Sequence, residues 1–398
     1  MEQLRGILKH YWGYDRFLPL QQEAMSCVVA GRDSVVILPT GGGKSLCFQA
    51  PAVVMPGLAV IVSPLISLMK DQIDALTGYG VPAGCLNSSL SAQERREVGE
   101  KIRSGNLKLL YVAPERLVGR DFIEYLQQFQ ISFIAVDEAH CISMWGHDFR
   151  PEYRGLRVLK EAFPKIAIHA YTATATPHVR DDIARELGLR NPQMLVGSFD
   201  RPNLIYKVMR RGNIVNQVCE VLERHPSESG IIYCIRRADV DEMFQTLAAK
   251  SYSVLPYHAG LTDDERKKNQ DAFIQEKVDI IIATVAFGMG IDKSNVRYVI
   301  HAGMPKSLEH YQQESGRAGR DGLEAECCLF YSGGDYGVWQ SILGNTESVD
   351  AAEIGLTKLK GIYNFCTGVS CRHQGLVKYF GQDLGKESCE ASMSAWVI

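Results

Sequence analysis

Short runs of consecutive apolar residues recur through the first half of the chain, with longer amphipathic stretches between them. The runs lie at 34–38, 59–62, 107–112, 133–136 and 168–171. Such short runs are typical of strands buried on both faces, whereas the polar stretch at 92–103 is typical of a helix. The alternation predicts an α/β lobe with a mainly parallel sheet.

A second series of apolar runs follows a polar joint at 198–203, which reads Ser-Phe-Asp-Arg-Pro-Asn. These runs lie at 230–234, 253–257, 279–283, 298–301 and 327–330. A chain of 398 residues has room for two to three domains of about 150 residues each. We therefore expect two α/β lobes, at 1–200 and 201–343, followed by a short helical segment at 344–398.

A glycine-rich stretch follows the first apolar run and ends in Lys44 and Ser45. Glycines allow backbone N–H groups to surround phosphates, and a helix that begins there adds its dipole. Lys44 would bring positive charge to the β- and γ-phosphates, and the Ser45 hydroxyl would ligate Mg²⁺. The residues expected to bind the nucleotide here are Thr40, Gly41, Gly42, Gly43, Lys44 and Ser45. Leu38 stands where the usual phosphate loop has its first glycine, so a purely structural turn is the alternative.

Two adjacent carboxylates, Asp137 and Glu138, follow the run at 133–136. Ligand groups gather at the carboxyl ends of strands in a parallel sheet. Asp137 would hold Mg²⁺ through water, while Glu138 would orient and deprotonate the attacking water. The pair favours nucleotide hydrolysis over the structural turn.

Gln21, upstream of the glycine-rich stretch, offers one hydrogen-bond donor and one acceptor, which is the pair that adenine N6 and N7 require. Tyr14 could stack on the base, although a tyrosine near a helix end is more often ordinary packing. ATP is therefore favoured over GTP.

The composition is that of an ordinary soluble protein, with 46% hydrophobic and 22% charged residues. The net charge of −3 gives no global basic signature, so nucleic-acid binding would need a local groove. No apolar run approaches the ~20 residues of a membrane span, and residues 1–10 contain no signal-peptide core. Eleven cysteines without a Cys-x-x-Cys pair fit a reducing cytoplasm.

Arg317 and Arg320 lie three residues apart in the glycine-containing stretch 313–322. This spacing would place both guanidinium groups on one face of a helix, where their planar forks suit phosphate recognition. We expect both to act catalytically on the transferring γ-phosphate. An exposed helix with ion pairs is the alternative, which the flanking glycines disfavour.

Taken in order, these motifs resemble those of superfamily-2 helicases, and specifically the RecQ family of DNA helicases, over nearly the whole chain. The matching stretches are 40–45, 63–72, 137–140 and 172–176, then 257–261, 283–293 and 316–320. The resemblance implies two RecA-like lobes with ATP and Mg²⁺ bound in the cleft between them. It also implies DNA-stimulated ATP hydrolysis, 3′ to 5′ movement along single-stranded DNA and duplex separation. The expected partner is single-stranded, branched or duplex DNA and not a membrane, in the cytoplasm or at a bacterial nucleoid.

The stretch 140–153 resembles the family's aromatic-rich loop, which couples DNA binding to hydrolysis. Trp145 and Phe149 offer faces for unstacked bases, each worth ~1–3 kcal/mol, and Arg150 can meet phosphate or the nucleotide site. Aromatic residues after a strand are more often core, but here polar residues are interleaved with them. His140 could be a core histidine or could link Glu138 to the second lobe.

Further DNA contacts are implied by the resemblance alone. They fall on Ser63, Ser67, Asn87, Arg116, His258 and Thr284. Contacts of this kind to the backbone carry little sequence information, so strand form would be recognised instead. For each serine and threonine, a helix cap or turn is an equal alternative.

Two substitutions depart from the family pattern. Leu18 stands where the family has an arginine, and this removes a cation–π partner of the base, worth ~0.5–2 kcal/mol. We expect weaker ATP binding with the chemistry intact. Met144 replaces the usual glutamine before Trp145, so hydrolysis is expected to depend less on DNA.

The tail resembles the start of the family's four-cysteine zinc module. Cys371 and Cys389 match two ligands, but Ser392 and Ala395 stand in the other two places. Cys366 or His373 could substitute, although neither has the expected position. A structural zinc site normally has four ligands, so we expect weak or absent zinc and poor order after about Gly385. The winged-helix and helical modules of many relatives are also expected to be missing.

Two other functions remain open from the sequence. One is a regulatory nucleic-acid-binding protein with weak or uncoupled ATPase activity and no unwinding, which Leu18, Met144 and the incomplete zinc module would suit. The other is an RNA helicase, which the loop around Trp145 disfavours.

Overall fold

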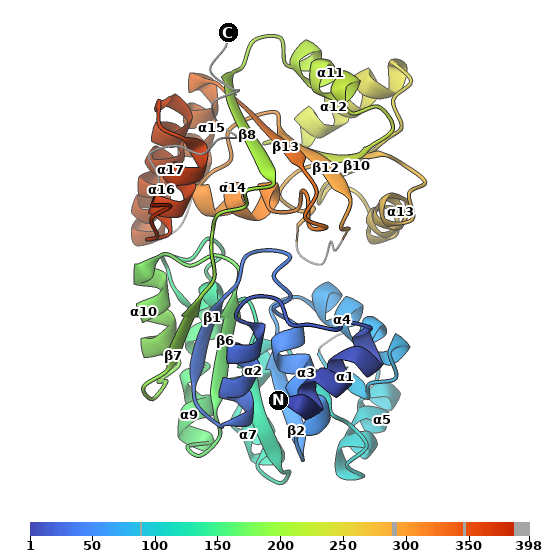
Figure 1. The fold of residues 1–398 in the computed structure, drawn as a ribbon, viewed down its shortest axis with the longest axis vertical. Helices are drawn as coiled ribbons and strands as arrows, with labels where there is room; N and C mark the ends of the chain where they lie inside the picture. The colour runs from blue at the N-terminus through green and yellow to red at the C-terminus, as the bar shows by residue number, and fades with distance from the viewer. Residues whose placement is uncertain (88–89, 289–292, 345–347, 386–398) are drawn as a thin grey trace. The chain divides into compact units, whose positions relative to one another are not determined.

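The computed structural model forms two compact α/β units, Met1–Gly197 and a second unit that begins at Ser198 (Figure 1). The division falls at the start of the polar joint. The structure describes residues 1–87, 90–288, 293–344 and 348–385.

The first unit is built on a seven-stranded sheet in the order β3-β4-β2-β5-β6-β1-β7, and every pairing is parallel. The strands are β1 Ser34–Ile37, β2 Leu58–Val62, β3 Ala83–Leu86, β4 Leu109–Val112, β5 Ile131–Val136, β6 Ile168–Thr172 and β7 Gln193–Val196. Ile37 pairs with Thr172, and Val62 pairs with Val136. The strands of each of these two pairs therefore end at the same level, and β6 runs two residues beyond the end of β5.

Ten α-helices and the short 3₁₀-helix η1 (Ala139–Ile142) surround this sheet in the described part of the unit. The α-helices are α1 Glu2–Trp12, α2 Gln21–Val29, α3 Leu46–Val54, α4 Ile66–Gly78, α5 Ala92–Arg103, α6 Pro114–Leu117, α7 Arg120–Leu126, α8 Pro151–Arg154, α9 Arg157–Ala162 and α10 Pro177–Glu186. Phe48 of α3 and Met69 of α4 pack with Val36 and Phe133 of the strands in one buried cluster. The predicted helix at 92–103 is confirmed as α5, where Ser91 and Glu94 form a capping box.

The second unit has a six-stranded parallel sheet in the order β10-β11-β9-β12-β13-β8. Its strands are β8 Leu204–Arg210, β9 Ser229–Tyr233, β10 Val254–Tyr257, β11 Ile280–Ala283, β12 Val296–His301 and β13 Ala325–Tyr331. Its helices are α11 Ile214–Arg224, α12 Arg237–Ala249, α13 Asp263–Ile274, α14 Leu308–Ser315, α15 Gly333–Gly344, α16 Val349–Thr367 and α17 Arg372–Tyr379. The expected α/β class with parallel sheets and a helical end is confirmed.

The C-terminal helices share the core of the second unit. Leu359 and Phe365 of α16 and Leu376 of α17 lie in the same buried cluster as Ile231 of β9. Phe380 also stacks on Phe199 near the start of the unit, with ring centroids 4.3 Å apart. The described part of the tail is thus packed onto the second lobe, while the poor order expected after Gly385 concerns residues outside those described.

Three strands, β3, β7 and β8, were not predicted from the apolar runs. Each lies at an edge of its sheet, and each has several residues that are only partly buried or exposed. An edge strand needs no continuous apolar run, so its sequence gives a weak signal. In the described part of the chain, no helix is both long and apolar enough to cross a membrane.

Candidate nucleotide and nucleic-acid site

The site residues predicted in the first unit follow the carboxyl ends of its strands. The glycine-rich loop follows β1, Ser63 follows β2, and Asp137 follows β5. Since these strands are parallel, their connecting loops meet at one edge of the sheet, where α/β proteins bind ligands.

The glycine-rich loop turns sharply between β1 and α3. Its Gly42 N–H donates to the carbonyl of Pro39 at 2.9 Å, and Gly43 has a φ of +68°. A Cβ atom on Gly43 would lie 2.3 Å from Nε2 of Gln21, so glycine is required there. Ser45 directly precedes α3, which places the helix N-terminus at the loop as predicted.

Gln21 is 2% exposed and lies against this loop. Its Oε1 accepts from the N–H of Leu18 at 2.9 Å, and its Nε2 lies 3.3 Å from the carbonyl oxygens of both Gly42 and Gly43. The carboxamide thus ties the predicted adenine motif to the phosphate loop. Tyr14 is 57% exposed, and its stacking on a base stays a prediction.

Lys44 and Ser45 are held by contacts within the first unit. Lys44 Nζ donates to the carbonyl of Leu38 at 3.4 Å, and Ser45 Oγ accepts from Nε2 of Gln72 at 3.0 Å. Gln72 Oε1 in turn accepts from Gln49 Nε2 at 2.6 Å. Gln72 lies within the matching stretch 63–72, but the sequence assigned it no role.

Asp137 and Glu138 form a crowded acidic pair at the end of β5. Burial, followed by the negative charge of Glu138, raises the pKa of Asp137, while Lys44 acts to lower it. The charges of Glu138 and Lys44 thus act on the Asp137 carboxyl in opposite directions. The backbone is fixed as well, because Asp137 Oδ1 accepts from the N–H of Glu138 at 2.9 Å and Tyr153 donates its hydroxyl to the Asp137 carbonyl at 3.0 Å.

This donor set suits Mg²⁺. Hydroxyl and carboxylate oxygens are the ligands that Mg²⁺ prefers, and a buried carboxylate with a raised pKa is stabilised as an anion by a cation. Ser45 and Asp137 are the residues that would hold the ion.

His140 is fully buried and links three parts of the first unit. Its Nδ1 lies 2.8 Å from Oγ1 of Thr172 and 3.3 Å from Oε2 of Glu138. Its ring also stacks on His147 at 3.8 Å, and Nδ1 of His147 lies 3.2 Å from Oγ1 of Thr174. These contacts place His140 between Glu138 and the aromatic-rich loop.

The aromatic-rich loop presents Trp145, whose side chain is 38% exposed and contacts His178 edge to face. Phe149 is half-buried under the guanidinium of Arg154. Arg150 contacts Asp148 and donates from Nη1 to the Pro64 carbonyl at 2.9 Å. The loop is thereby joined to the stretch that leads into α4.

The other predicted DNA-binding residues differ in accessibility. Ser63, Asn87 and His258 are buried at 1%, 2% and 5% exposure, whereas Ser67 is exposed. His258 Nε2 lies 3.0 Å from Oδ1 of Asp241, and its Nδ1 accepts from the N–H of Gly260 at 3.1 Å. Both ring nitrogens are thus used within the second unit.

Thr284 and Arg116 are placed by local contacts. Thr284 Oγ1 accepts from the N–H of Ala286 at 3.5 Å, as a turn residue does, and the Arg116 guanidinium lies 5.0 Å from the Phe122 ring centroid.

The helix predicted for Arg317 and Arg320 is wrong. Helix α14 ends at Ser315, and the residues that follow form turns in which Gly319 has a φ of +56°. The glycines stop the helix, so the two arginines cannot share a helical face. Arg317 is 5% exposed and lies beside the hydroxyl of Tyr233, where it opposes the rise that burial causes in the tyrosine pKa.

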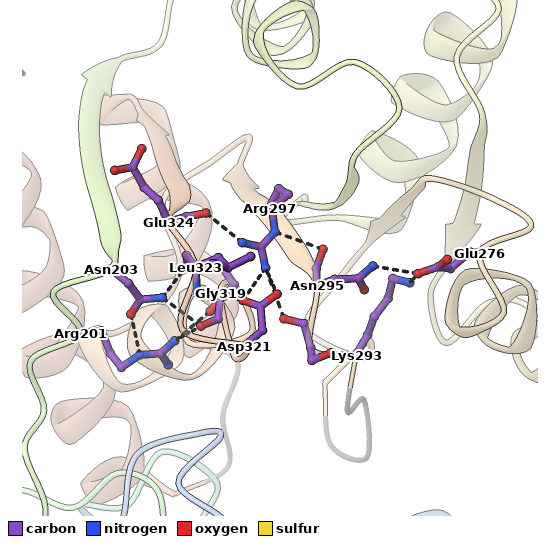
Figure 2. Close-up of polar contacts among 12 residues, drawn as sticks. Arg201, Asn203, Glu276, Lys293, Asn295, Arg297, Gly319, Asp321, Leu323 and Glu324 are labelled. Atoms are coloured by element: carbon purple, nitrogen blue, oxygen red, sulfur yellow. Dashed lines mark hydrogen bonds and ion pairs between the residues drawn. The ribbon is translucent and has the colours of Figure 1, made fainter.

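Figure 2 shows how this turn is held by Arg201 and Asn203, from the segment that opens the second unit. Arg201 Nη2 donates to the carbonyls of Ala318 at 3.0 Å and Gly319 at 2.8 Å. Asn203 Nδ2 donates to Gly319 at 2.9 Å and to Leu323 at 2.8 Å. Neither residue was singled out from the sequence, because such contacts span more than a hundred positions.

The far side of the turn is fixed by an ion pair between Arg297 and Asp321, with Nη2 2.7 and 2.6 Å from the two carboxylate oxygens (Figure 2). Next to it, Glu276 Oε1 accepts from Lys293 at 3.1 Å and from Asn295 at 2.7 Å. These contacts tie the end of the matching stretch 283–293 to the turn that follows α13.

The described residues do not assemble a zinc site. They contain no group of three His, Cys, Asp or Glu side chains able to hold a metal ion. Cys366 and Cys371 are buried, and His373 Nδ1 lies 2.7 Å from Oδ1 of Asp200. A carboxylate partner on Nδ1 is compatible with metal binding through Nε2, so His373 stays an open alternative, while Cys389, Ser392 and Ala395 lie outside the described residues.

Sequence comparisons with protein families match three successive segments. The model of the DEAD/DEAH box helicase family matches residues 18–183, and that of the helicase conserved C-terminal domain matches residues 213–322. The model of the RecQ zinc-binding family matches residues 334–392. The last match is consistent with zinc, although the described donors do not form a site.

Curated relatives cover almost the whole chain. The ATP-dependent DNA helicase RecQ of Pasteurella multocida is 45% identical over 386 residues, which are 96% of this chain and 61% of the relative. RecQ of Bacillus subtilis is 42% identical over 384 residues, 96% of this chain and 65% of the relative. A putative ATP-dependent RNA helicase of Acanthamoeba polyphaga mimivirus is 40% identical over 392 residues, 98% of this chain and 71% of the relative. The chain thus spans 61% and 65% of the two bacterial relatives.

Solved structures share the fold at low sequence identity. Mycobacterium smegmatis helicase Lhr bound to ssDNA and AMP-PNP superposes with a TM-score of 0.65 at 18% identity, over 93% of this chain and 58% of that chain. S. cerevisiae Dbp5 bound to RNA and ADP BeF3 also gives 0.65, at 16% identity, over 89% of this chain and 97% of that chain. The fold is therefore that of two RecA-like helicase lobes, and with the sequence matches it shows that the chain belongs to the RecQ family of superfamily-2 helicases.

Proposed function

We propose that this chain is an ATP-dependent DNA motor that hydrolyses ATP with Mg²⁺, moves 3′ to 5′ along single-stranded DNA and separates duplexes. The observation that carries the proposal is the adjacent pair of buried Asp137 and partly buried Glu138 directly after β5, in the same parallel sheet whose β1 leads into the glycine-rich loop with Lys44 and Ser45. The names of the RecQ relatives, ATP-dependent DNA helicases, support it.

In the nucleotide site, Ser45 and Asp137 would hold Mg²⁺, which supplies positive charge to the β- and γ-phosphate oxygens. Lys44 would exchange its 3.4 Å contact with the Leu38 carbonyl for phosphate oxygens. Glu138 would accept a proton from the attacking water, with His140 3.3 Å from its Oε2 to orient it.

The proposed role of Arg317 and Arg320 is to stabilise the negative charge that develops on the transferring phosphoryl group. The anchored turn supports this role, because catalytic groups act best when their supporting contacts fix them before the substrate arrives.

For DNA, we propose that bases stack on Trp145 and that Phe149 and Arg150 support the loop carrying it. We propose that the DNA backbone is contacted mainly by the segments that follow strand ends. The remaining candidates lie in these segments, and they are Ser63, Asn87, His258 and Thr284.

We further propose a reducing cytoplasmic compartment and no tightly bound structural zinc. All ten cysteines in the described part of the chain are free thiols. Analysis of metal in the purified protein tests the second statement, and one zinc ion per chain after dialysis would overturn it.

Steady-state ATP hydrolysis with Mg²⁺, with and without single-stranded DNA, tests the proposed function. We expect DNA-stimulated turnover that Lys44→Ala removes and that Lys101→Ala, a charge deletion on the exposed face of α5, retains. Retained DNA binding without turnover would instead favour the regulatory binding protein.

Polarity and substrate class need two further comparisons. A duplex with a 3′ single-stranded tail should be separated faster than one with a 5′ tail. Because a mimivirus relative carries the name of a putative RNA helicase, RNA strands should be compared with DNA strands of the same sequence. Stronger stimulation by RNA would overturn the choice of DNA.

A further inference from the structure

Gln72 touches the proposed metal site from a helix that belongs to the proposed DNA-binding side. Its Nε2 donates to Oγ of Ser45 at 3.0 Å. Its helix, α4, begins at Ile66, shortly after Ser63. One side chain therefore joins the hydroxyl expected to ligate Mg²⁺ to the segment expected to meet DNA.

The orientation of the Gln72 carboxamide is fixed by two buried donors. Its Oε1 accepts from Gln49 Nε2 at 2.6 Å and from the Tyr111 hydroxyl at 3.3 Å. Burial raises the pKa of Tyr111, so its hydroxyl remains a donor. In this arrangement the carboxamide presents its oxygen to Gln49 and Tyr111 and its amine to Ser45.

This orientation leaves Ser45 ready for a cation. A hydroxyl oxygen has two lone pairs, and the one that accepts from Gln72 fixes the oxygen in place. The other lone pair stays available to a metal ion, and the hydroxyl proton points away from Gln72. Hydrogen bonds of this kind orient metal ligands and tune affinity.

The segment just before α4 is joined to the aromatic-rich loop. Arg150 donates to the carbonyl of Pro64, two residues before the helix begins, at 2.9 Å. The contacts run continuously from the Trp145 loop through Pro64 and α4 to Gln72 and Ser45, all within the first unit.

We propose that Gln72 is a positioning residue that couples DNA contact at the aromatic-rich loop to Mg²⁺ binding at Ser45. The proposal rests on the proposed function, in which Ser45 ligates Mg²⁺. A shift of α4 when DNA binds would change the Gln72–Ser45 bond and with it the affinity for the metal.

Gln72→Leu tests this coupling, because leucine fills a similar volume without donor or acceptor. The readout is the binding of a fluorescent non-hydrolysable ATP analogue during titration with Mg²⁺, with and without an oligothymidine strand. Losing one hydrogen bond of ordinary strength should raise the Mg²⁺ concentration at half-saturation about fivefold. In the wild-type protein the strand should change that concentration, and in Gln72→Leu the change should be lost.

Two further variants keep the test decisive. Tyr111→Phe retains the buried ring but loses one anchor of Gln72, so its shift should be about twofold in the same direction. Gln128→Leu makes the same chemical change at an exposed position of the first unit and should shift nothing. Thermal unfolding of each variant shows that the fold is retained.

Wild-type Mg²⁺ dependence and a wild-type DNA effect in both Gln72→Leu and Tyr111→Phe would overturn the role of Gln72. A wild-type protein that binds the analogue regardless of Mg²⁺ and shows no turnover would instead refute the proposed function itself, so the two failures are distinguishable.

Discussion

Replacing Arg201 with alanine is expected to slow ATP hydrolysis by loosening the turn that carries the two proposed catalytic arginines. The change removes donors to the carbonyls of Ala318 at 3.0 Å and Gly319 at 2.8 Å. Asn203 still donates to Gly319 at 2.9 Å and to Leu323 at 2.8 Å, and the Arg297–Asp321 ion pair is unchanged, so the turn retains its other anchors. The turn should stay folded but become less well positioned.

Arg201 also makes longer contacts, 3.4 Å to Asn203 Oδ1 and 3.5 Å to the Gly316 carbonyl, so the magnitude is taken from the two short bonds to Ala318 and Gly319. Hydrogen bonds from charged groups contribute ~1.5–3 kcal/mol each, but Arg201 is only half-buried and water can replace part of them. We therefore take ~1–3 kcal/mol for the two together. If all of it is lost from the transition state, kcat falls roughly 5- to 150-fold, at about 1.4 kcal/mol for each factor of ten.

The assay is kcat and KM for ATP at saturating single-stranded DNA. A fall in kcat with little change in KM is expected, because the turn acts on the transition state. The kcat of Arg201→Lys should lie between those of the wild type and Arg201→Ala, since an ammonium can reach both carbonyls but lacks the planar guanidinium fork. Arg210→Ala, which truncates an exposed arginine at the end of β8, is the matched control. A kcat for Arg201→Ala within about twofold of wild type, in a folded protein, would refute the reasoning.

Three more predictions concern single side chains. Trp145→Ala should weaken single-stranded DNA binding by ~1–3 kcal/mol, as measured by fluorescence anisotropy, and unchanged affinity would remove Trp145 from the DNA site. Gly319→Ala should destabilise the second unit by ~1–3 kcal/mol in urea unfolding, since φ is +56° and the new Cβ would lie 2.5 Å from Asn203 Nδ2. Gly322→Ala, with a φ of +84° and open space around the Cβ, should cost only ~1 kcal/mol, and equal losses would contradict the steric argument. Burial lowers the pKa of His169 to about 3. Below the ordinary histidine pKa, the unfolded state therefore binds a proton that the folded state does not bind, so the free energy of unfolding decreases as the pH is lowered. The first unit should lose about 2 kcal/mol between pH 7 and 5 from this group, at ~1.4 kcal/mol per pH unit below ~6.5, and His169→Gln should flatten that dependence in urea titrations.

The central strands could be predicted from the sequence because they are buried on both faces. The run at 133–136 became the carboxyl half of β5, and the run at 230–234 largely became β9. The edge strands β3, β7 and β8 could not, because they are only partly buried and their apolar runs are short or interrupted, whereas the edge strand β10 was predicted from its run at 253–257.

Some parts of the candidate site could be predicted because their residues are neighbours in sequence, whereas others depend on contacts between distant positions. The glycine-rich loop and the carboxylate pair are each contiguous in sequence, so spacing alone indicated them. The contact between Gln72 and Ser45 spans 27 positions, and that between Arg201 and Gly319 spans 118. Only the folded chain brings such partners together. The helix predicted around Arg317 is wrong because the three-residue spacing of the arginines does not outweigh the glycines, which favour the end of α14.

In each lobe, the residues that stabilise the fold and the residues proposed to carry the chemistry lie in different segments, on either side of the carboxyl ends of the strands. The strands supply the buried surface that makes each lobe fold, whereas the chemistry is carried by the loops beyond them. Leu18 lies in the connection between α1 and α2, and Met144 lies in the loop that follows β5 and η1, so neither departure from the family pattern in the first unit is in a strand. Substitutions there can alter nucleotide affinity or DNA dependence while the core is left unchanged. This arrangement lets a protein of this architecture change its rate and its requirements without losing the ability to fold.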